Sequence, residues 1–210
     1  MNTALLYLTY LPNINWLRAF TSYDEIVVER EENFIKSTPR NRCEIAGANG
    51  RQTLSIPIIG GRDHHQLYKD VRISYQNDWQ RIHWHSIRSA YGSAPYFEHY
   101  ADKFLPLYER QFDLLFEYNT EFLNAILPLL RIDKKIKFTT SYEGQVADMV
   151  DLRKDGIPVR NDNDSIGNDI AINTKRYYQV FEQRNGFIPN LSIIDLLMNE
   201  GPGATRYLTG

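Results

Sequence analysis

The sequence lacks several features that would each mark a class of protein. It has a single cysteine, Cys43, so no internal disulfide and no zinc site built on cysteine pairs can form within the chain. It has no Gly-rich loop of the GxGxxG or P-loop type, so nothing predicts the usual cradle for a dinucleotide or a nucleoside triphosphate. We therefore expect neither a resident cofactor nor a bound metal.

A charge excess and long apolar runs are also missing. The 24 basic and 26 acidic residues give a formal net charge of -2, which provides no basic field for nucleic-acid phosphates or anionic lipids. The apolar run at residues 4–8 is short and has no basic leader, unlike a signal peptide or a membrane-spanning helix. We predict a cytoplasmic protein with no nucleic-acid partner and no membrane insertion, and we leave its oligomeric state open.

The chain does have enough apolar material for one folded domain. Hydrophobic residues make up 42% of the 210 positions and charged residues 24%, which suits a single domain over residues 1–210. The segment 148–173 is rich in Gly, Asn and Asp, and we expect a polar excursion there rather than a domain boundary.

The first 30 residues predict a parallel β–α–β unit. Strands are expected at 4–10 and 24–29, with a helix at 14–23 that Asn13 caps. This unit predicts an α/β fold with a Rossmann-like, mostly parallel sheet. Ligands of such sheets bind at the carboxyl ends of the strands, which places Tyr10 at a candidate site.

The rest of the chain predicts an inserted β-hairpin and a helical segment. Asn49 and Gly50 form a hairpin-turn signal between two alternating strands, and Pro128 should bend or end the helix that contains it. The expected strands lie at 42–46, 52–58, 71–74 and 136–141, and the expected helices follow Asn77 or Asp78 and span 94–110, 112–130 and 189–198.

His83 is the candidate catalytic residue. At helical spacing it shares an apolar face with Trp79 and Ile87, so its side chain points into the protein. His85 lies about 200° around the helix axis from it, so the two cannot bind one metal ion. An inward histidine serves either as a general base, because its unperturbed pKa is about 6.5, or as a core residue that hydrogen-bonds to a carbonyl or a tyrosine hydroxyl.

Cationic and aromatic residues are the candidates for substrate binding. Lys36, Asn41 and Arg42 belong to a basic segment around a proline that either closes over a phosphate or carboxylate or simply solvates a loop. Trp84 and Tyr91 either stack on a sugar or a base or pack in the core. For each residue we keep both interpretations.

Five groups of short motifs occur along the chain. They are Tyr10-Leu11-Pro12, Lys36 with Asn41-Arg42, Leu54-Ser55-Ile56-Pro57, His83-Trp84 with Ser89-Ala90-Tyr91 and Pro95-Tyr96-Phe97, and Asn190-Leu191-Ser192-Ile193-Ile194-Asp195. In this order and spacing they resemble the WbqC-like protein family over nearly the whole chain. Tyr7-Leu8 departs from the family, in which many members carry Gln-Pro just before the Tyr-x-Pro turn. In the last motif, helix capping competes with a chemical role for the polar side chains.

The resemblance implies a role in bacterial surface-polysaccharide (O-antigen) biosynthesis. It implies a transferase that modifies a nucleotide-linked amino sugar by acyl or amino-acyl transfer, so the expected partner is a sugar or a nucleotide sugar. In this hypothesis His83 is the general base, and Arg42 and Lys36 hold a phosphate or carboxylate. The hypothesis requires His83 and Arg42 to face a common hollow.

Two other functions compete with the transferase hypothesis. One is a non-catalytic protein of the same pathway that binds a sugar or nucleotide, or acts as a scaffold. The other is a nucleotidyltransferase, which the β–α–β start suggests. The absence of a paired-histidine phosphate motif after the first strand counts against this last function.

Overall fold

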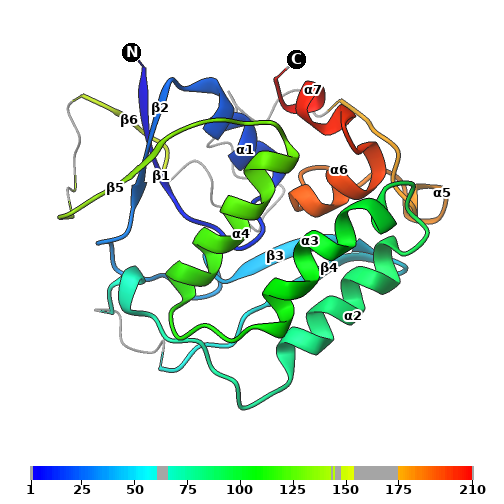
Figure 1. Ribbon diagram of the computed structural model, residues 1–210, viewed down its shortest axis with the longest axis horizontal. Coiled ribbons are helices and arrows are strands. Elements are labelled where there is room, and N and C mark those ends of the chain that lie inside the picture. Colours follow the sequence, from blue (N-terminus) through cyan, green and yellow to red (C-terminus); the bar gives the residue numbers. More distant parts are fainter. Residues whose placement is uncertain (1, 61–65, 143, 145–147, 154–174, 210) are drawn as a thin grey trace.

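The β–α–β unit predicted at the start of the chain is present in the computed structural model of the protein (Figure 1). β1 (Thr3–Tyr7) and β2 (Glu25–Glu29) pair in parallel, and α1 (Ile14–Ser22) connects them. The Asn13 side chain accepts a hydrogen bond from the Trp16 backbone N–H at 2.8 Å, as predicted for the helix cap. Local sequence signals therefore suffice to define this unit.

A single parallel sheet contains both strands of this unit. Its order is β5–β2–β1–β6, where β5 spans Ile136–Phe138 and β6 spans Val150–Asp151, and every pairing is parallel. The strand order reverses at β1, because β2 lies on one side of it and β6, from much later in the chain, lies on the other. The prediction of an α/β fold with a mostly parallel sheet is confirmed. The structure describes every residue except 1, 61–65, 143, 145–147, 154–174 and 210.

The predicted hairpin is confirmed as a separate antiparallel sheet of two strands. β3 (Arg42–Gly47) pairs with β4 (Gly50–Ser55). Gly50 has a φ of 102°, which a glycine adopts without steric strain and which closes the turn. The hairpin lies on the helical side of the molecule, away from the parallel sheet (Figure 1).

Helices form the other half of the molecule. Their bounds are Tyr68–Asp70 for the short 3-10 helix η1, Trp79–Tyr91 for α2, Phe97–Glu109 for α3, Leu115–Leu129 for α4, Glu182–Asn185 for α5, Ile193–Glu200 for α6 and Gly203–Thr209 for α7. Pro128 lies in the last turn of α4, which ends one residue later, as expected. Figure 1 shows α2 and α3 side by side next to the hairpin, and α6 and α7 above them.

Two predicted elements differ from the structure, and a third, the polar excursion, is described only in part. Residues 71–74 form no strand, because this segment makes only isolated bridges, in which Ile73 pairs with Ile58. The segment 148–173 opens with β6, which joins the parallel sheet, whereas its residues 154–173 lie outside the described residues. The last predicted helix starts later, at α6, and is followed by α7, which the sequence patterns did not predict.

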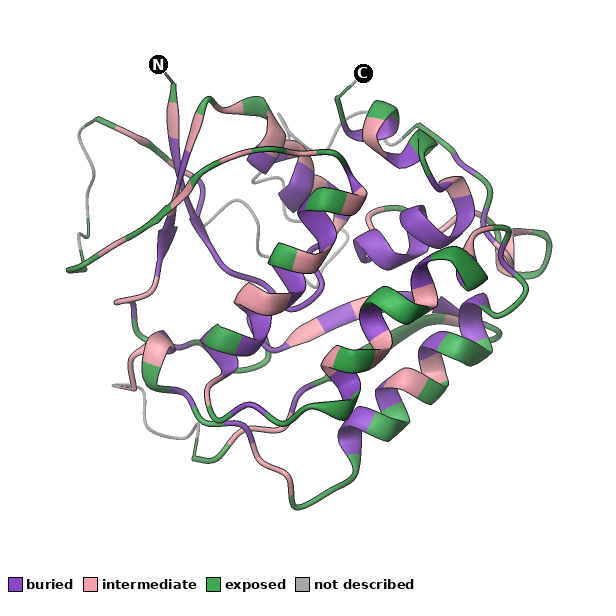
Figure 2. Ribbon diagram, viewed as in Figure 1, coloured by how far each residue is buried: buried purple, intermediate pink, exposed green. Residues whose placement is uncertain are grey.

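The buried apolar side chains form one core cluster that includes residues of the parallel sheet, the hairpin and helices α1, α2, α3, α4, α6 and α7 (Figure 2). Leu6 of β1, Val28 of β2 and Phe122 of α4 are inaccessible to solvent or nearly so. Seven of the eight residues of α6 are buried, so this helix is inside the protein rather than on its surface. Within the described part of the chain, no helix is long and apolar enough to cross a membrane.

Candidate functional site

Most of the buried charged side chains lie at the carboxyl ends of the parallel strands. β1 ends at Tyr7, β2 at Glu29 and β6 at Asp151, and because the strands are parallel these ends share one edge of the sheet. In open parallel sheets, ligands bind outside this edge at the point where the strand order reverses. The order reverses at β1, so this edge holds the candidate site.

Glu29 forms the first ion pair at this edge, with Arg153. Its side chain is inaccessible to solvent, and its Oε2 lies 3.1 Å from Nη1 of Arg153. Its Oε1 accepts hydrogen bonds from the Thr139 hydroxyl at 2.6 Å and from the Glu31 backbone N–H at 2.8 Å. Arg153 also binds Asp151 through two nitrogen atoms, at 2.9 and 2.7 Å. Three segments of the chain are therefore fixed to one another by charge-assisted hydrogen bonds.

A second ion pair lies beside the first. Nε and Nη2 of Arg40 lie 2.7 and 2.6 Å from Oε1 of Glu32, and both side chains are buried. Burial raises the pKa of the Glu32 carboxyl, and the Arg40 charge offsets part of this rise. The charges of Glu29 and Arg153 also act on Glu32, which shows that the two pairs are neighbours. We call Glu29, Glu32, Arg40, Asp151 and Arg153 the carboxyl-edge cluster.

Two tyrosines extend the carboxyl-edge cluster. The Arg40 guanidinium lies over the Tyr7 ring, 4.0 Å from its centroid, and Tyr7 is fully buried. The Tyr7 hydroxyl has no hydrogen-bond partner among the described residues, and burial raises its pKa, so it stays a neutral donor. Tyr142 is 58% exposed and lies 5.3 Å from the Arg153 guanidinium, so it presents an aromatic face at the surface of the cluster.

His83 lies in the core, in a chain of hydrogen bonds between neutral groups. Its Nδ1 is 3.0 Å from the Tyr10 hydroxyl, which is 2.8 Å from the Tyr108 hydroxyl. The Trp79 ring lies 5.1 Å from the imidazole. Burial lowers the pKa of His83 to about 4, although a hydrogen bond with the Ser55 backbone opposes the shift. We call Tyr10, Trp79, His83 and Tyr108 the His83 core group, and its geometry favours the interpretation of a core histidine.

The predicted cationic loop is not brought to the carboxyl edge as a unit. Lys36 is exposed, whereas the Asn41 amide donates to the Ile56 carbonyl at 3.1 Å and so fixes the loop. Arg42 begins β3 opposite Ser55, the residue that also hydrogen-bonds to His83. The Arg42 Nε is buried and has no hydrogen-bond partner among the described residues.

The two predicted stacking residues have packing partners. The Trp84 ring lies 6.3 Å from Phe97 and 5.7 Å from Tyr108, and Trp84 is half-buried. Tyr91 is inaccessible to solvent, and its hydroxyl accepts a hydrogen bond from the Ala46 backbone N–H at 3.1 Å. The structure therefore favours the core interpretation for Trp84 and Tyr91.

The last sequence motif combines a helix cap with a buried acid. Ser192 caps α6 by accepting from the Ile194 N–H at 3.4 Å, so the capping prediction is confirmed for Ser192, whereas the Asn190 Oδ1 accepts from the Asn15 backbone N–H at 3.0 Å. Asp195 is fully buried, and its Oδ2 accepts from the Tyr177 hydroxyl at 2.5 Å and from the Gln179 amide at 3.0 Å. Burial raises the pKa of Asp195 to about 6, although these hydrogen bonds oppose the rise.

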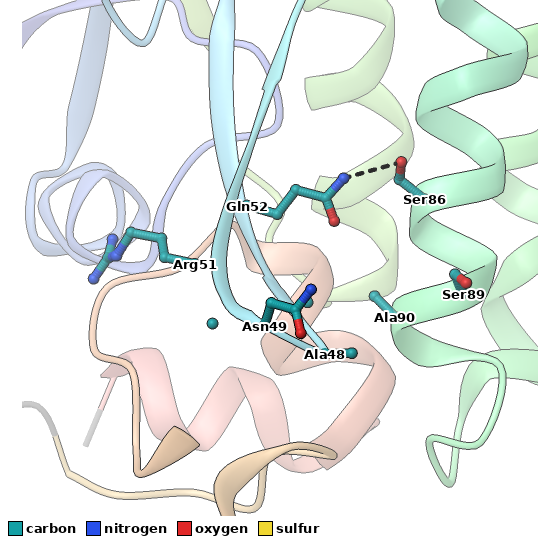
Figure 3. A pocket seen from close by; sticks show the side chains of 9 residues that line it. Ala48, Asn49, Arg51, Gln52, Ser86, Ser89 and Ala90 are labelled. Carbon is teal, nitrogen blue, oxygen red and sulfur yellow. Dashed lines mark hydrogen bonds between the residues drawn. The ribbon is translucent and has the colours of Figure 1, made fainter. Parts of the chain in front are cut away.

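A pocket of about 440 Å³ lies between the tip of the hairpin and α2 (Figure 3). Its lining consists of residues 47–52 together with Ser86, Ser89 and Ala90, so it includes neither His83 nor Arg42. Among the residues that the structure describes, no group of three or more metal-binding side chains comes together.

Sequence reasoning did not select Glu29, Arg40 or Arg153. Glu29 and Arg40 occur in charged stretches that are typical of solvated surface, and Arg153 lies in the polar segment expected to be an excursion. The one available signal was that Glu29 ends the second predicted strand, which is the edge where parallel sheets bind ligands.

Comparisons with known proteins agree with the family resemblance that the sequence motifs indicate. The model of the WbqC-like protein family matches residues 9–155 and 159–207. The chain is 28% identical over 224 residues to the uncharacterized protein Rv1507c of Mycobacterium tuberculosis, an alignment that covers 98% of this chain and 96% of that protein. No solved structure matches the chain significantly.

Proposed function

The chain belongs to the WbqC-like protein family, and we propose that it is a cytoplasmic transferase that modifies a nucleotide-linked amino sugar. The reaction is acyl or amino-acyl transfer to the sugar amine during surface-polysaccharide biosynthesis. The resemblance of the sequence motifs supports the substrate class. The side chains at the carboxyl edge support the position of the site, because function has to be argued from a site rather than from a fold.

One observation carries this proposal, namely the carboxyl-edge cluster at the reversal of the strand order. In a Rossmann-like sheet this is where the ligand binds. Among the described residues, the cluster contains three carboxylates and two guanidiniums, and carboxylates suit the amine and hydroxyl groups of an amino sugar. The side chain of Asp151 is 29% exposed and Tyr142 lies beside it over Arg153, so a ligand reaches the cluster from the surface and stacks on an aromatic ring.

The transfer step needs a base and an oriented donor. The sugar amine attacks the carbonyl carbon of the acyl donor, a C–N bond forms, and the bond from that carbon to the leaving group breaks. We assign removal of the amine proton to Glu32, because burial raises its pKa towards the range in which a carboxylate is an effective base. Glu29 and Asp151 fix the Arg153 guanidinium, whose three nitrogen atoms all bind these carboxylates, so Arg153 holds the strand ends together around the reacting groups.

The proposal does not assign the proton transfer to His83. Its ring is buried and hydrogen-bonded to Tyr10, and a pKa of about 4 makes the imidazole a weak base. In the same way, the positions of Trp84 and Tyr91 support roles in packing. Lys36 and Arg42 remain the candidates for an anionic group that reaches beyond the carboxyl-edge cluster.

A thermal-stability screen with UDP-, GDP- and dTDP-linked amino sugars tests the proposal. A ligand that binds only the folded protein adds roughly 2.7 kcal/mol at a hundred times its Kd. We expect one nucleotide sugar to raise the Tm of the wild type and to leave the Tm of Glu29→Gln unchanged. Glu182→Gln is the matched control, because Glu182 forms an exposed ion pair with Arg176. The proposal fails if no nucleotide sugar is bound, or if Glu29→Gln binds it as well as the control does.

The alternative function is a non-catalytic protein that binds the same sugar or nucleotide. It is favoured by the fact that Glu29 and Glu32 are both paired with arginines, so neither carboxylate is free to take a proton until a pair opens. Both functions predict the thermal shift. Only the transferase forms a modified sugar when an acyl donor is added, and only its activity falls by orders of magnitude in Glu32→Gln.

A further inference from the structure

The pocket between the hairpin and α2 is a second place where a small molecule fits. Its volume of about 440 Å³ lies within the range of roughly 300–1,000 Å³ that is typical of small-molecule sites. One wall is the tip of the hairpin and the other is the part of α2 that carries Ser86, Ser89 and Ala90, of which Ala90 lies towards the hairpin tip (Figure 3).

The hairpin wall is held in place from its far side. The Asn185 amide donates to the Gly47 carbonyl at 3.1 Å, which fastens the tip to α5. Arg51 binds the Pro189 carbonyl at 3.0 Å and also pairs with Glu44. Figure 3 shows the Arg51 side chain on the opposite face of the hairpin from α2, so this guanidinium points away from the pocket. The hairpin wall is therefore anchored by Asn185 and by the Arg51 side chain, neither of which occupies the space between the hairpin and α2.

The described hydrogen-bonding side chains that face the pocket are uncharged, and Ala48 and Ala90 add apolar surface to the lining. Asn49 and Gln52 come from the hairpin, and Ser86 and Ser89 come from α2. Amides and hydroxyls each donate and accept hydrogen bonds, which matches the hydroxyl groups of a sugar ring. The Gln52 amide donates to the Ser86 hydroxyl at 3.2 Å across the pocket, and a ligand hydroxyl can replace either partner in this bond.

The lining also disfavours charged ligands. Among the described residues of the lining, Arg51 is the only ionisable one, and it is turned towards Glu44. The Arg184 guanidinium donates to the Asn49 Oδ1 at 3.4 Å, so one cation borders the lining without belonging to it. A carboxylate or phosphate in the pocket would lose hydration without gaining an opposite charge among the described side chains of the lining that face it. From this lining we propose that the pocket binds an uncharged saccharide, such as a neutral hexose or an N-acetylhexosamine.

This saccharide site is separate from the carboxyl-edge cluster. In Figure 1 the carboxyl end of β2 and the tip of the hairpin lie on opposite sides of the molecule, so one monosaccharide does not contact both. The inference therefore goes beyond the proposed transferase and does not depend on it. The two sites are also separable by mutation, because they share no residue.

NMR titration of the wild-type protein with the methyl glycosides of glucose, galactose, mannose and N-acetylglucosamine tests the inference. We expect at least one glycoside to shift the backbone amide signals of residues 47–52 and of the α2 face. Ser89→Trp should weaken this binding at least tenfold, because the indole fills the pocket from an exposed position of α2. Arg88→Trp is the matched control, since Arg88 is also exposed on α2 but does not line the pocket, and its affinity should stay within twofold of the wild type.

Glucuronate tests whether the pocket disfavours a negatively charged saccharide. It should bind at least tenfold more weakly than the methyl glycoside of glucose, because no described side chain that faces the pocket is cationic. The inference is overturned if no glycoside shifts these signals at tens of millimolar, if Ser89→Trp binds like Arg88→Trp, or if glucuronate binds more tightly. Glu29→Gln should leave glycoside binding unchanged, so this experiment can succeed or fail independently of the nucleotide-sugar screen.

Discussion

The carboxyl-edge cluster and the His83 core group are both buried and polar, but they are built in different ways. The carboxyl-edge cluster contains ionised side chains in salt bridges, in which Glu29 binds Arg153 and Glu32 binds Arg40. The His83 core group contains neutral groups joined by hydrogen bonds between hydroxyls and an imidazole. Burying a charge is costly unless it is paired, whereas a neutral group needs only a hydrogen-bond partner.

This difference separates a region suited to ligands from a region suited to stability. The carboxyl-edge cluster borders the Tyr7 hydroxyl, which has no hydrogen-bond partner among the described residues and so has bonding capacity left. In the His83 core group, Tyr10 joins His83 to Tyr108, and the imidazole also bonds to the Ser55 backbone. The imidazole and both hydroxyls are therefore used within the protein, whereas the Trp79 Nε1 of the same group is buried without a partner among the described residues.

The largest predicted effect comes from breaking an ion pair of the carboxyl-edge cluster. Arg40→Met should lower the free energy of unfolding by about 3–5 kcal/mol, because it leaves the Glu32 carboxylate buried and unpaired. Chemical denaturation measures this loss.

The double variant Arg40→Met with Glu32→Gln is the control for this prediction. It removes both charges, so it should recover a large part of the lost stability. If the double variant is as unstable as Arg40→Met, the cost comes from lost packing over Tyr7 and not from an unpaired charge.

The second prediction concerns the pH dependence of the His83 core group. The pKa of His83 is about 4 in the folded protein and about 6.5 when unfolded, so between these values the unfolded chain binds more protons. Acidification from pH 6.5 to 4 should therefore cost about 3 kcal/mol through His83 alone. His83→Phe, which cannot titrate, should lose less stability over this range. Denaturation curves at a series of pH values measure the difference.

The comparison with His83→Phe is necessary because Asp195 acts in the opposite direction. Burial raises the pKa of Asp195 to about 6, so its contribution to stability is lost as the pH rises and is regained as the pH falls. Asp195→Asn should therefore make the acid loss steeper than in the wild type. Parallel pH profiles for the wild type and His83→Phe would contradict the buried, neutral state of His83.

The two regions also differ in how much the sequence alone could predict. The inward direction of His83 follows from the 3.6-residue period of its helix, and its alternative role as a core histidine bound to a tyrosine was foreseen. The identity of its partner was not foreseen, because Tyr10 and His83 are 73 residues apart and meet only through tertiary packing.

The carboxyl-edge cluster was harder to predict for the same reason. The β–α–β unit and the hairpin follow from local periodicity and from turn residues, and both are confirmed. Glu29 and Arg153 come together only because β6 pairs with β1 after more than a hundred intervening residues. A charged residue that the sequence assigns to a solvated surface becomes buried when such a pairing brings a partner of opposite charge.

The smallest predicted effect compares the two buried tyrosine hydroxyls. Tyr10→Phe should lower the free energy of unfolding by about 1–2 kcal/mol, because it removes the hydroxyl that joins His83 to Tyr108 and leaves buried polar atoms without a partner. Tyr7→Phe should leave stability unchanged or raise it by up to about 1 kcal/mol, because the Tyr7 hydroxyl is buried without a partner among the described residues. Denaturation of both variants under the same conditions measures this contrast.

The same pair of variants separates ligand binding from stability. If the Tyr7 hydroxyl serves the ligand of the carboxyl-edge cluster, Tyr7→Phe should reduce the thermal shift caused by a bound nucleotide sugar even though the free protein is no less stable. Tyr10→Phe should keep the full shift on a less stable protein, because its hydroxyl is used within the His83 core group. The reverse result, in which only Tyr10→Phe loses the shift, would move the ligand site from the carboxyl edge to His83.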